Sequence, residues 1–220
     1  MRTSSASQQG RWKDIVRSCR NPAAVHYPLP TMEGPVMCGH QLLGDSHMVR
    51  LGAYLGWRME GVRPARIGLC VSGQTVLQLR RLVDDHGYFA KPVIVLIGSN
   101  DLRNDCVYRT LRADIHRLIM KLRVLAPAVT FLTIPPAPAM WRNVIYRRHV
   151  LALGRWLHRY YRWGIRVVDI TTPFLVHHGG VDDTFFERYM GKGNRRRPDG
   201  VHLNQRGMEV VMECLERSVW

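Results

Sequence analysis

Two segments at opposite ends of the chain hold the residue types of a nucleophilic serine site. Ser46 follows an apolar run and begins a helix-like stretch, where backbone N–H groups would point at whatever its hydroxyl attacks. Asp199 and His202 lie three residues apart, so in a turn the carboxylate can reach the imidazole. A serine nucleophile needs such a base, and the base needs a group that fixes its tautomer. These three residues are candidates for a catalytic triad.

Two further segments could stabilise negative charge on a carbonyl oxygen. Gly73 follows a second apolar run, where a residue without a side chain can expose its N–H to a ligand. Asn100 follows a third and offers an amide donor of the kind that forms an oxyanion hole. Each segment alone has an ordinary structural alternative, because Ser and Asp are common helix N-caps, glycine serves turns and Asn makes Asx turns. The joint occurrence of all four favours catalysis.

The elements that must position these residues alternate along the chain. We expect strands at Met37–Leu43, Arg66–Val71, Pro92–Ile97, Val129–Ile134 and Ile165–Ile170, because these apolar runs barely alternate, as in strands buried on both faces. We expect helices at Ser46–Glu60, Thr75–His86, Val107–Leu125, Met140–Trp163 and Gln205–Val219. This order predicts an α/β fold with three layers, in which helices flank a doubly wound, mainly parallel five-stranded sheet. The loops at the carboxyl ends of its strands would bring the polar segments together.

The four segments, in this order, resemble the sequence blocks of the SGNH hydrolase superfamily, the GDSL-type esterases and lipases. Gly44-Asp45-Ser46 is similar to the first block and Gly73 to the second. Gly98-Ser99-Asn100-Asp101 is similar to the third, and Asp199-Gly200-Val201-His202 to the last. The resemblance covers the chain from about Met37 to the C-terminus and implies an SGNH hydrolase-like, flavodoxin-like fold.

The resemblance also implies an activity. Ser46 would attack a small acetyl or acyl ester, His202 would take the proton, and Asp199 would orient His202. The N–H groups of Ser46 and Gly73 and the amide of Asn100 would form the oxyanion hole, with no metal and no organic cofactor. His47 departs from the pattern, because many members carry an aliphatic residue after the nucleophile, and we expect it to face solvent.

The resemblance does not explain the net charge of the chain. The 220 residues include 32 Lys and Arg but only 17 Asp and Glu, which gives a net charge of +15. Such a charge attracts nucleic acid or acidic surfaces. No acidic residue occurs between Asp114 and Asp169, and arginines interleaved with aromatics suit phosphate contact and base stacking. The candidate polyanion-binding residues are Arg147, Arg148, Arg155, Arg159, Arg162, Arg195, Arg196 and Arg197. Their spacing predicts that Arg155, Arg159 and Arg162 share one helix face. The alternative to polyanion binding is that this face is only solvated.

The sequence therefore supports two candidate functions from different classes. One is a carboxylic ester hydrolase. The other is a binding module of the same fold that holds RNA or another polyanion, with or without esterase activity, as in the insect protein Oskar or in retroelement-encoded domains. The C-terminal domain of Oskar resembles this superfamily, lacks the catalytic serine and binds RNA. Because serine, asparagine, aspartate and histidine are all present here, the esterase is favoured.

The N-terminal segment differs from the rest of the chain. Residues 1–10 are rich in Ser and Gln, and four prolines between Asn21 and Pro35 forbid a continuous helix. We expect a flexible tail at residues 1–35 and one SGNH-like domain at 36–220. The polar N-terminus lacks a signal-peptide core, no apolar run can span a bilayer, and the five cysteines are never spaced as CxxC. These features predict an intracellular, cytoplasmic protein.

Overall fold

The computed structural model describes residues 34–60, 64–104, 106–191 and 196–219. The expected tail at residues 1–35 lies outside the described residues except for its last two, and the division into a tail and one domain stays a prediction. Within the described ranges, no helix combines the length and the apolar character needed to cross a membrane.

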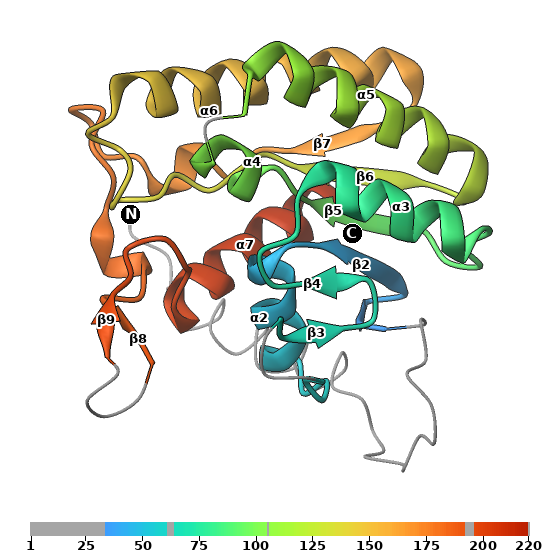
Figure 1. The fold of residues 1–220 in the computed structure, drawn as a ribbon, viewed down its shortest axis with the longest axis horizontal. Coiled ribbons are helices and arrows are strands. Elements are labelled where there is room, and N and C mark those ends of the chain that lie inside the picture. Colours follow the sequence, from blue (N-terminus) through green and yellow to red (C-terminus); the bar gives the residue numbers. More distant parts are fainter. Residues whose placement is uncertain (1–33, 61–63, 105, 192–195, 220) are drawn as a thin grey trace, which may run out of the picture.

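A mainly parallel sheet forms the middle layer of the molecule (Figure 1). Its strands are β1 (Val36–Met37), β2 (His40–Gly44), β3 (Arg66–Ile67), β4 (Cys70–Val71), β5 (Val93–Leu96), β6 (Val129–Leu132) and β7 (Arg166–Val168). Strands β4, β2, β5, β6 and β7 are parallel neighbours in that order. This is the strand order of flavodoxin-like doubly wound sheets, and the predicted fold class is confirmed.

Two of the expected strands are each divided by a turn. Cys38 and Gly39 both have positive φ, 45° and 78°, and separate β1 from β2. Gly68, with φ of 55°, separates β3 from β4, and a β carbon there would clash with the carbonyl oxygen of Gly34. Strands β1 and β3 pair antiparallel with β2 and β4, so the sheet has seven strands instead of the expected five.

Helices cover both faces of the sheet (Figure 1). Helices α3 (Val76–His86), α5 (Tyr108–Leu125) and α6 (Val144–Leu157) pack on one face, and α2 (Ser46–Tyr54) and α7 (Gln205–Val219) on the other. Successive strand residues alternate between the two cores: Leu43 and Val95 belong to the first, Leu42 and Ile94 to the second. Apolar residues on both faces explain why the strands read as continuous apolar runs.

Several connecting elements differ from the expected ones. Helix α2 ends at Tyr54 instead of Glu60, and the short helix α4 (Ser99–Arg103) follows β5, where no helix was predicted. The helix expected at Met140–Trp163 is α6 followed by the 3-10 helix η1 (His158–Trp163). Between β7 and α7 the chain forms the 3-10 helices η2 (Thr172–Phe174) and η3 (Asp183–Phe185) and the hairpin β8 (Tyr189–Met190) and β9 (Arg197–Pro198).

Candidate active site

Ser46 is the first residue of α2, at the carboxyl end of β2. Asp45 is the N-cap of this helix, and its carboxyl oxygen accepts a hydrogen bond from the backbone N–H of His47 at 3.0 Å. Gly44 has φ of 148°, and a β carbon there would clash with the carbonyl oxygen of Leu96 on β5. The sharp turn from strand to helix therefore needs glycine, and it fixes Ser46 at the edge of the sheet.

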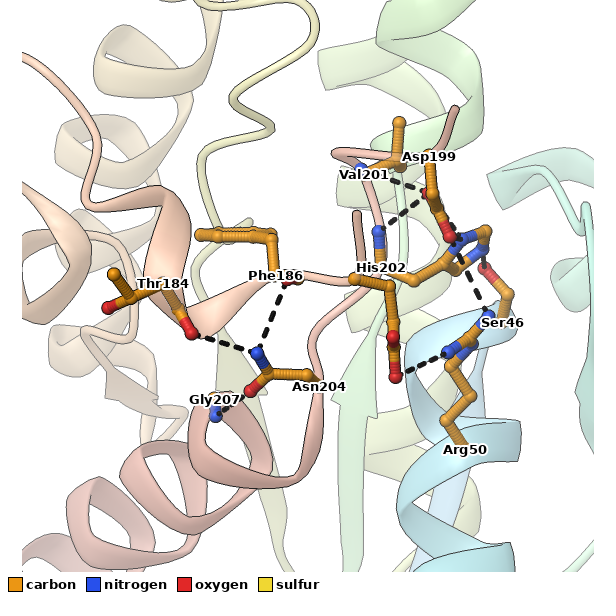
Figure 2. A network of polar contacts seen from close by, with 10 residues as sticks. Ser46, Arg50, Thr184, Phe186, Asp199, Val201, His202, Asn204 and Gly207 are labelled. Atoms are coloured by element: carbon orange, nitrogen blue, oxygen red, sulfur yellow. Dashed lines mark hydrogen bonds and ion pairs between the residues drawn. The ribbon is translucent and has the colours of Figure 1, made fainter. Parts of the chain in front are cut away.

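Ser46, His202 and Asp199 form a continuous hydrogen-bonded chain (Figure 2). His202 Nε2 lies 3.1 Å from Ser46 Oγ, across 156 residues of sequence. His202 Nδ1 lies 2.8 Å from Asp199 Oδ2 and 3.0 Å from Asp199 Oδ1. The structure thus brings Ser46 together with the Asp199–His202 pair, which lies far from it in the sequence.

The surroundings of Asp199 determine which nitrogen of His202 carries the proton. The backbone N–H groups of Val201 and His202 donate to Asp199 Oδ1 at 3.0 and 3.2 Å. Burial raises the pKa of Asp199, but hydrogen bonds from the His202 ring and from these N–H groups outweigh burial, so the pKa lies below its usual value. Because a carboxylate only accepts, His202 Nδ1 donates to it and Nε2 is left to accept from the Ser46 hydroxyl. This tautomer is the one in which His202 can act as a base.

Arg50 is a neighbour of this chain that the sequence patterns did not indicate. It lies one helical turn after Ser46, and its guanidinium is 3.8 Å from Asp199 Oδ2 and 3.9 Å from Glu187 Oε1 (Figure 2). The side chains of Arg50 and Glu187 are 33% and 41% exposed, so this ion pair contributes little to stability, whereas the side chain of Asp199 is 2% exposed. Its spacing of four residues from Ser46 was the available signal, because residues i and i+4 share a helix face.

The expected oxyanion donors lie on loops that follow β2, β4 and β5. Asn100, in α4, is buried, and its Nδ2 donates to the backbone oxygen of Gln74 at 3.0 Å. Gly73 is exposed with φ of 81°, and no atom lies within 4 Å of the position that a β carbon would take. The Asp101 carboxylate accepts from the Val76 N–H at 3.1 Å, which ties α4 to the start of α3. The role of Ser46, Gly73 and Asn100 as an oxyanion hole stays a prediction.

The expectation that His47 faces solvent is wrong. Its side chain is buried, with 5% of the residue exposed, and its ring centroid lies 5.8 Å from that of His202. The first turn of α2 is covered by the segment that carries His202, which sequence periodicity cannot reveal. Burial, and then the positive charges of His202 and Arg50, lower the pKa of His47 to about 3. His47 is therefore a neutral neighbour of the base at physiological pH.

Asp45 has an unusual ionisation. It is fully buried, and its Oδ1 accepts a hydrogen bond from the His47 N–H. Burial raises its pKa from 3.8 to about 7, against the opposing effects of hydrogen bonds from the His47 N–H and the Ser99 side chain. The folded protein therefore keeps a proton on Asp45 that the unfolded chain releases at lower pH, so the contribution of Asp45 to the free energy of unfolding falls as pH rises from about 4 to about 7.

We expect Asp45→Asn to remove the part of the pH dependence of the unfolding free energy that Asp45 causes. Asparagine keeps an acceptor for the His47 N–H and cannot ionise, so the variant should exceed wild type in unfolding free energy by about 2–4 kcal/mol at pH 8 and by little at pH 4. Denaturant unfolding at both pH values measures the difference, with exposed Asp85→Asn on α3 as the matched control. A difference between variant and wild type that is the same at pH 4 and at pH 8 would contradict the expectation.

The candidate polyanion-binding arginines do not form one surface. Arg147, Arg148 and Arg155 are exposed on α6, and Arg159 and Arg162 on η1, where three residues make a turn. Arg159 and Arg162 therefore share a face of η1, whereas the single α-helix expected to carry Arg155 with them ends at Leu157. The β8–β9 hairpin that carries Arg197 lies far from the upper helices α5 and α6 (Figure 1). Arg196 stacks over Tyr189 there at 4.3 Å, and Arg195 lies outside the described residues.

Within the described part of the chain, no group of three or more His, Cys, Asp or Glu side chains is arranged to hold a metal ion.

Comparison with known proteins gives one family and one fold. Residues 26–219 match the sequence profile of the OSK domain. No curated protein sequence matches the chain. The OSK domain of Drosophila Oskar is similar in structure, with a TM-score of 0.75 and 19% identity over 89% of this chain and 98% of that chain.

Two hydrolases share the architecture at lower similarity. A GDSL-like lipase from Bacteroides thetaiotaomicron gives a TM-score of 0.57 and 17% identity over 94% of this chain and 95% of that chain. An acetylxylan esterase from Geobacillus stearothermophilus gives 0.53 and 15% over 70% and 71%. At such identities the likeness concerns the fold alone, and it confirms the expected SGNH hydrolase-like fold.

Proposed function

The chain belongs to the OSK-domain family, and we propose that this member is a serine esterase that hydrolyses an acetyl or acyl ester. The observation that carries the proposal is the hydrogen-bonded chain from Ser46 Oγ through His202 to Asp199, at 3.1 and 2.8 Å. Nucleophile, base and orienting carboxylate have the mutual distances and the tautomer that serine catalysis needs. The fold alone would not support an activity, because one fold hosts many functions.

The reaction has two halves. Ser46 Oγ attacks the ester carbonyl carbon while His202 Nε2 takes the hydroxyl proton, and Asp199 stabilises the imidazolium that forms. The tetrahedral intermediate collapses when the carbon–oxygen bond to the alcohol breaks, and His202 returns the proton to the departing alkoxide. Water then gives its proton to His202 and attacks the acyl-serine, releasing the acid and restoring Ser46. The N–H groups of Ser46 and Gly73 and the amide of Asn100 would hold the oxyanion in both halves.

The test is hydrolysis of p-nitrophenyl acetate and p-nitrophenyl butyrate by the purified chain. We expect release of many molecules of p-nitrophenol per chain, because acylation of a surface lysine or histidine would stop after one. Folded protein that releases no more than one molecule per chain from either ester would contradict the proposal. The ratio of the two rates reports how long an acyl group the site accepts.

Binding of RNA or another polyanion is a second candidate function, and a specific observation favours it. Arg155, Arg159 and Arg162 are exposed at the end of α6 and in η1, beside Tyr161 and Trp163, whose exposed fractions are 77% and 50%. Exposed aromatic faces among arginines suit stacking of bases and contact with phosphates. Arg123 already stacks over Trp163 at 5.7 Å, so a further cation adjoins the same ring.

We expect charge reversal in η1 to weaken binding of a single-stranded oligouridine RNA. Arg159→Glu/Arg162→Glu should lower the affinity at least tenfold, and the slope of log affinity against log salt should fall by about 0.7 for each phosphate that the variant no longer neutralises. Fluorescence anisotropy across a salt series measures both. Arg81→Glu/Arg217→Glu, which reverses two exposed charges on α3 and α7, is the matched control for net charge. Equal losses of affinity in both double variants would leave only a non-specific effect of net charge.

A further inference from the structure

The loops that follow β2, β4 and β5 are linked by hydrogen bonds that run through Asn100. Its Nδ2 donates to the backbone oxygen of Gln74 at 3.0 Å, and its Oδ1 accepts from Arg103 Nη2 at 2.9 Å. The buried side chain of Gln74 continues the link. With its amide in the orientation that satisfies its neighbours, its nitrogen donates to the carbonyl oxygens of Gly44 and Leu69 at 2.7 and 3.2 Å. A chain of hydrogen bonds thus runs from Arg103 to the residue two before Ser46.

Arg103 fixes which end of the Asn100 amide faces which neighbour. A half-turn of the amide would put Nδ2 against the guanidinium and Oδ1 against the Gln74 carbonyl. A donor would then face a donor, and an acceptor would face an acceptor. In the observed orientation the Gln74 carbonyl takes one of the two hydrogens on Nδ2. The structure shows no acceptor for the second among the described residues, and this is the hydrogen that would meet a substrate oxygen. Without Arg103, only the Gln74 carbonyl would distinguish the two orientations of the amide.

The guanidinium also changes the strength of the donor. A hydrogen bond from a cation to an amide oxygen draws electron density from the amide and makes its N–H a stronger donor. Arg103 is exposed, but the hydrogen bond that it donates is partly buried, so water screens its charge only in part. Its position at the end of α4, three residues after Asn100, puts both side chains on the same face of that short helix.

We propose that Arg103 is a positioning residue, which holds and polarises the Asn100 amide as a donor to the oxyanion. The inference rests on the proposed esterase function for its kinetic consequence, whereas the orientation of Asn100 can be tested without it. Arg103 itself does not touch the reacting atoms; it acts through Asn100.

The kinetic test is a double-mutant cycle with p-nitrophenyl butyrate. Arg103→Met should lower kcat about tenfold and change KM less than about twofold, because the lost interaction belongs to the transition state. Arg103→Lys should recover part of the loss. Asn100→Ala should lower kcat about 100-fold, the effect typical of a lost oxyanion donor, and Arg103→Met should add nothing to it. A loss from Arg103→Met that persists in the Asn100→Ala background would overturn the inference.

The structural test is the side-chain amide signal of Asn100 in a ¹⁵N-labelled protein, assigned with Asn100→Ala. In wild type and Arg103→Lys we expect two resolved hydrogens that exchange slowly with solvent, and in Arg103→Met we expect their protection to fall at least tenfold. Arg81→Met, which changes an exposed arginine on α3, should change neither the Asn100 signal nor kcat.

If wild type shows no turnover, the esterase proposal fails, but the Asn100 signal still decides whether Arg103 holds Asn100. An unchanged signal in folded Arg103→Met would refute the positioning role.

Discussion

Ser46→Ala is expected to lower kcat for p-nitrophenyl butyrate by at least about 10⁴-fold while leaving the thermal unfolding midpoint almost unchanged. Without the hydroxyl no acyl-enzyme can form, and only the oxyanion donors and substrate binding remain to accelerate attack by water. The folded structure loses one hydrogen bond, from Ser46 Oγ to His202 Nε2, at a site where water can replace it. Steady-state kinetics and differential scanning fluorimetry of the same preparations measure the two effects.

Ser218→Ala is the matched control for this change, because Ser218 is an exposed serine on α7. It should keep wild-type kcat. If Ser46→Ala retained more than about a tenth of wild-type turnover, Ser46 would be excluded as the nucleophile, and another group would have to carry the activity.

Asp199→Asn is expected to have the second largest effect, a loss of about 10⁴-fold in kcat. Asparagine would present N–H donors to His202, so Nδ1 would become the acceptor and Nε2 would carry the proton. The imidazole would then be unable to take the proton of Ser46, although the atoms of the site stay in place. Comparison of kcat with a crystal structure of the variant separates this tautomer effect from displacement of His202.

The same carboxylate affects stability with a defined sign. The pKa of Asp199 is lower in the folded protein than its usual value, so its contribution is fully present above about pH 4, the usual pKa of Asp, and is lost as pH falls through the lower folded value. The difference in unfolding free energy between wild type and Asp199→Asn should therefore be constant from pH 6 to pH 8 and shrink in acid. Exposed Asp183→Asn is the control, with an expected difference near zero throughout. A wild-type advantage that grows as the solution is acidified would contradict this sign.

The order of elements could be predicted from the sequence because buried parallel strands and amphipathic helices have different periods. Val93–Leu96 and Val129–Leu132 are buried at every position, and all of their residues except Thr130 are apolar, which indicates strands buried on both faces. The breaks inside the first two expected strands were not visible, since Gly39 and Gly68 are single glycines whose φ depends on what they pack against. Similarly, η1 continues the apolar and aromatic pattern of α6 although its helical period has changed.

The residues that form the candidate triad could be chosen from the sequence, because Ser46 follows an expected strand, and Asp199 and His202 lie three residues apart just before an expected helix. Their neighbours could not be chosen in this way. Whether His47 is buried depends on how the segment carrying His202 covers α2, and whether Arg103 reaches Asn100 depends on α4. Five residues make too short a helix to leave a periodic pattern, so α4 and the contacts that it creates required the three-dimensional structure.

The most direct test of the central claim is covalent labelling of the folded wild-type protein by a fluorophosphonate, followed by intact-mass analysis and peptide mapping. The hydrogen-bonded chain of Ser46, His202 and Asp199 predicts one adduct per chain, on Ser46, absent in Ser46→Ala and much slower in His202→Ala. Wild-type protein that is folded and stays unlabelled, or that is labelled on a residue other than Ser46, would contradict the assignment of Ser46 as an activated nucleophile.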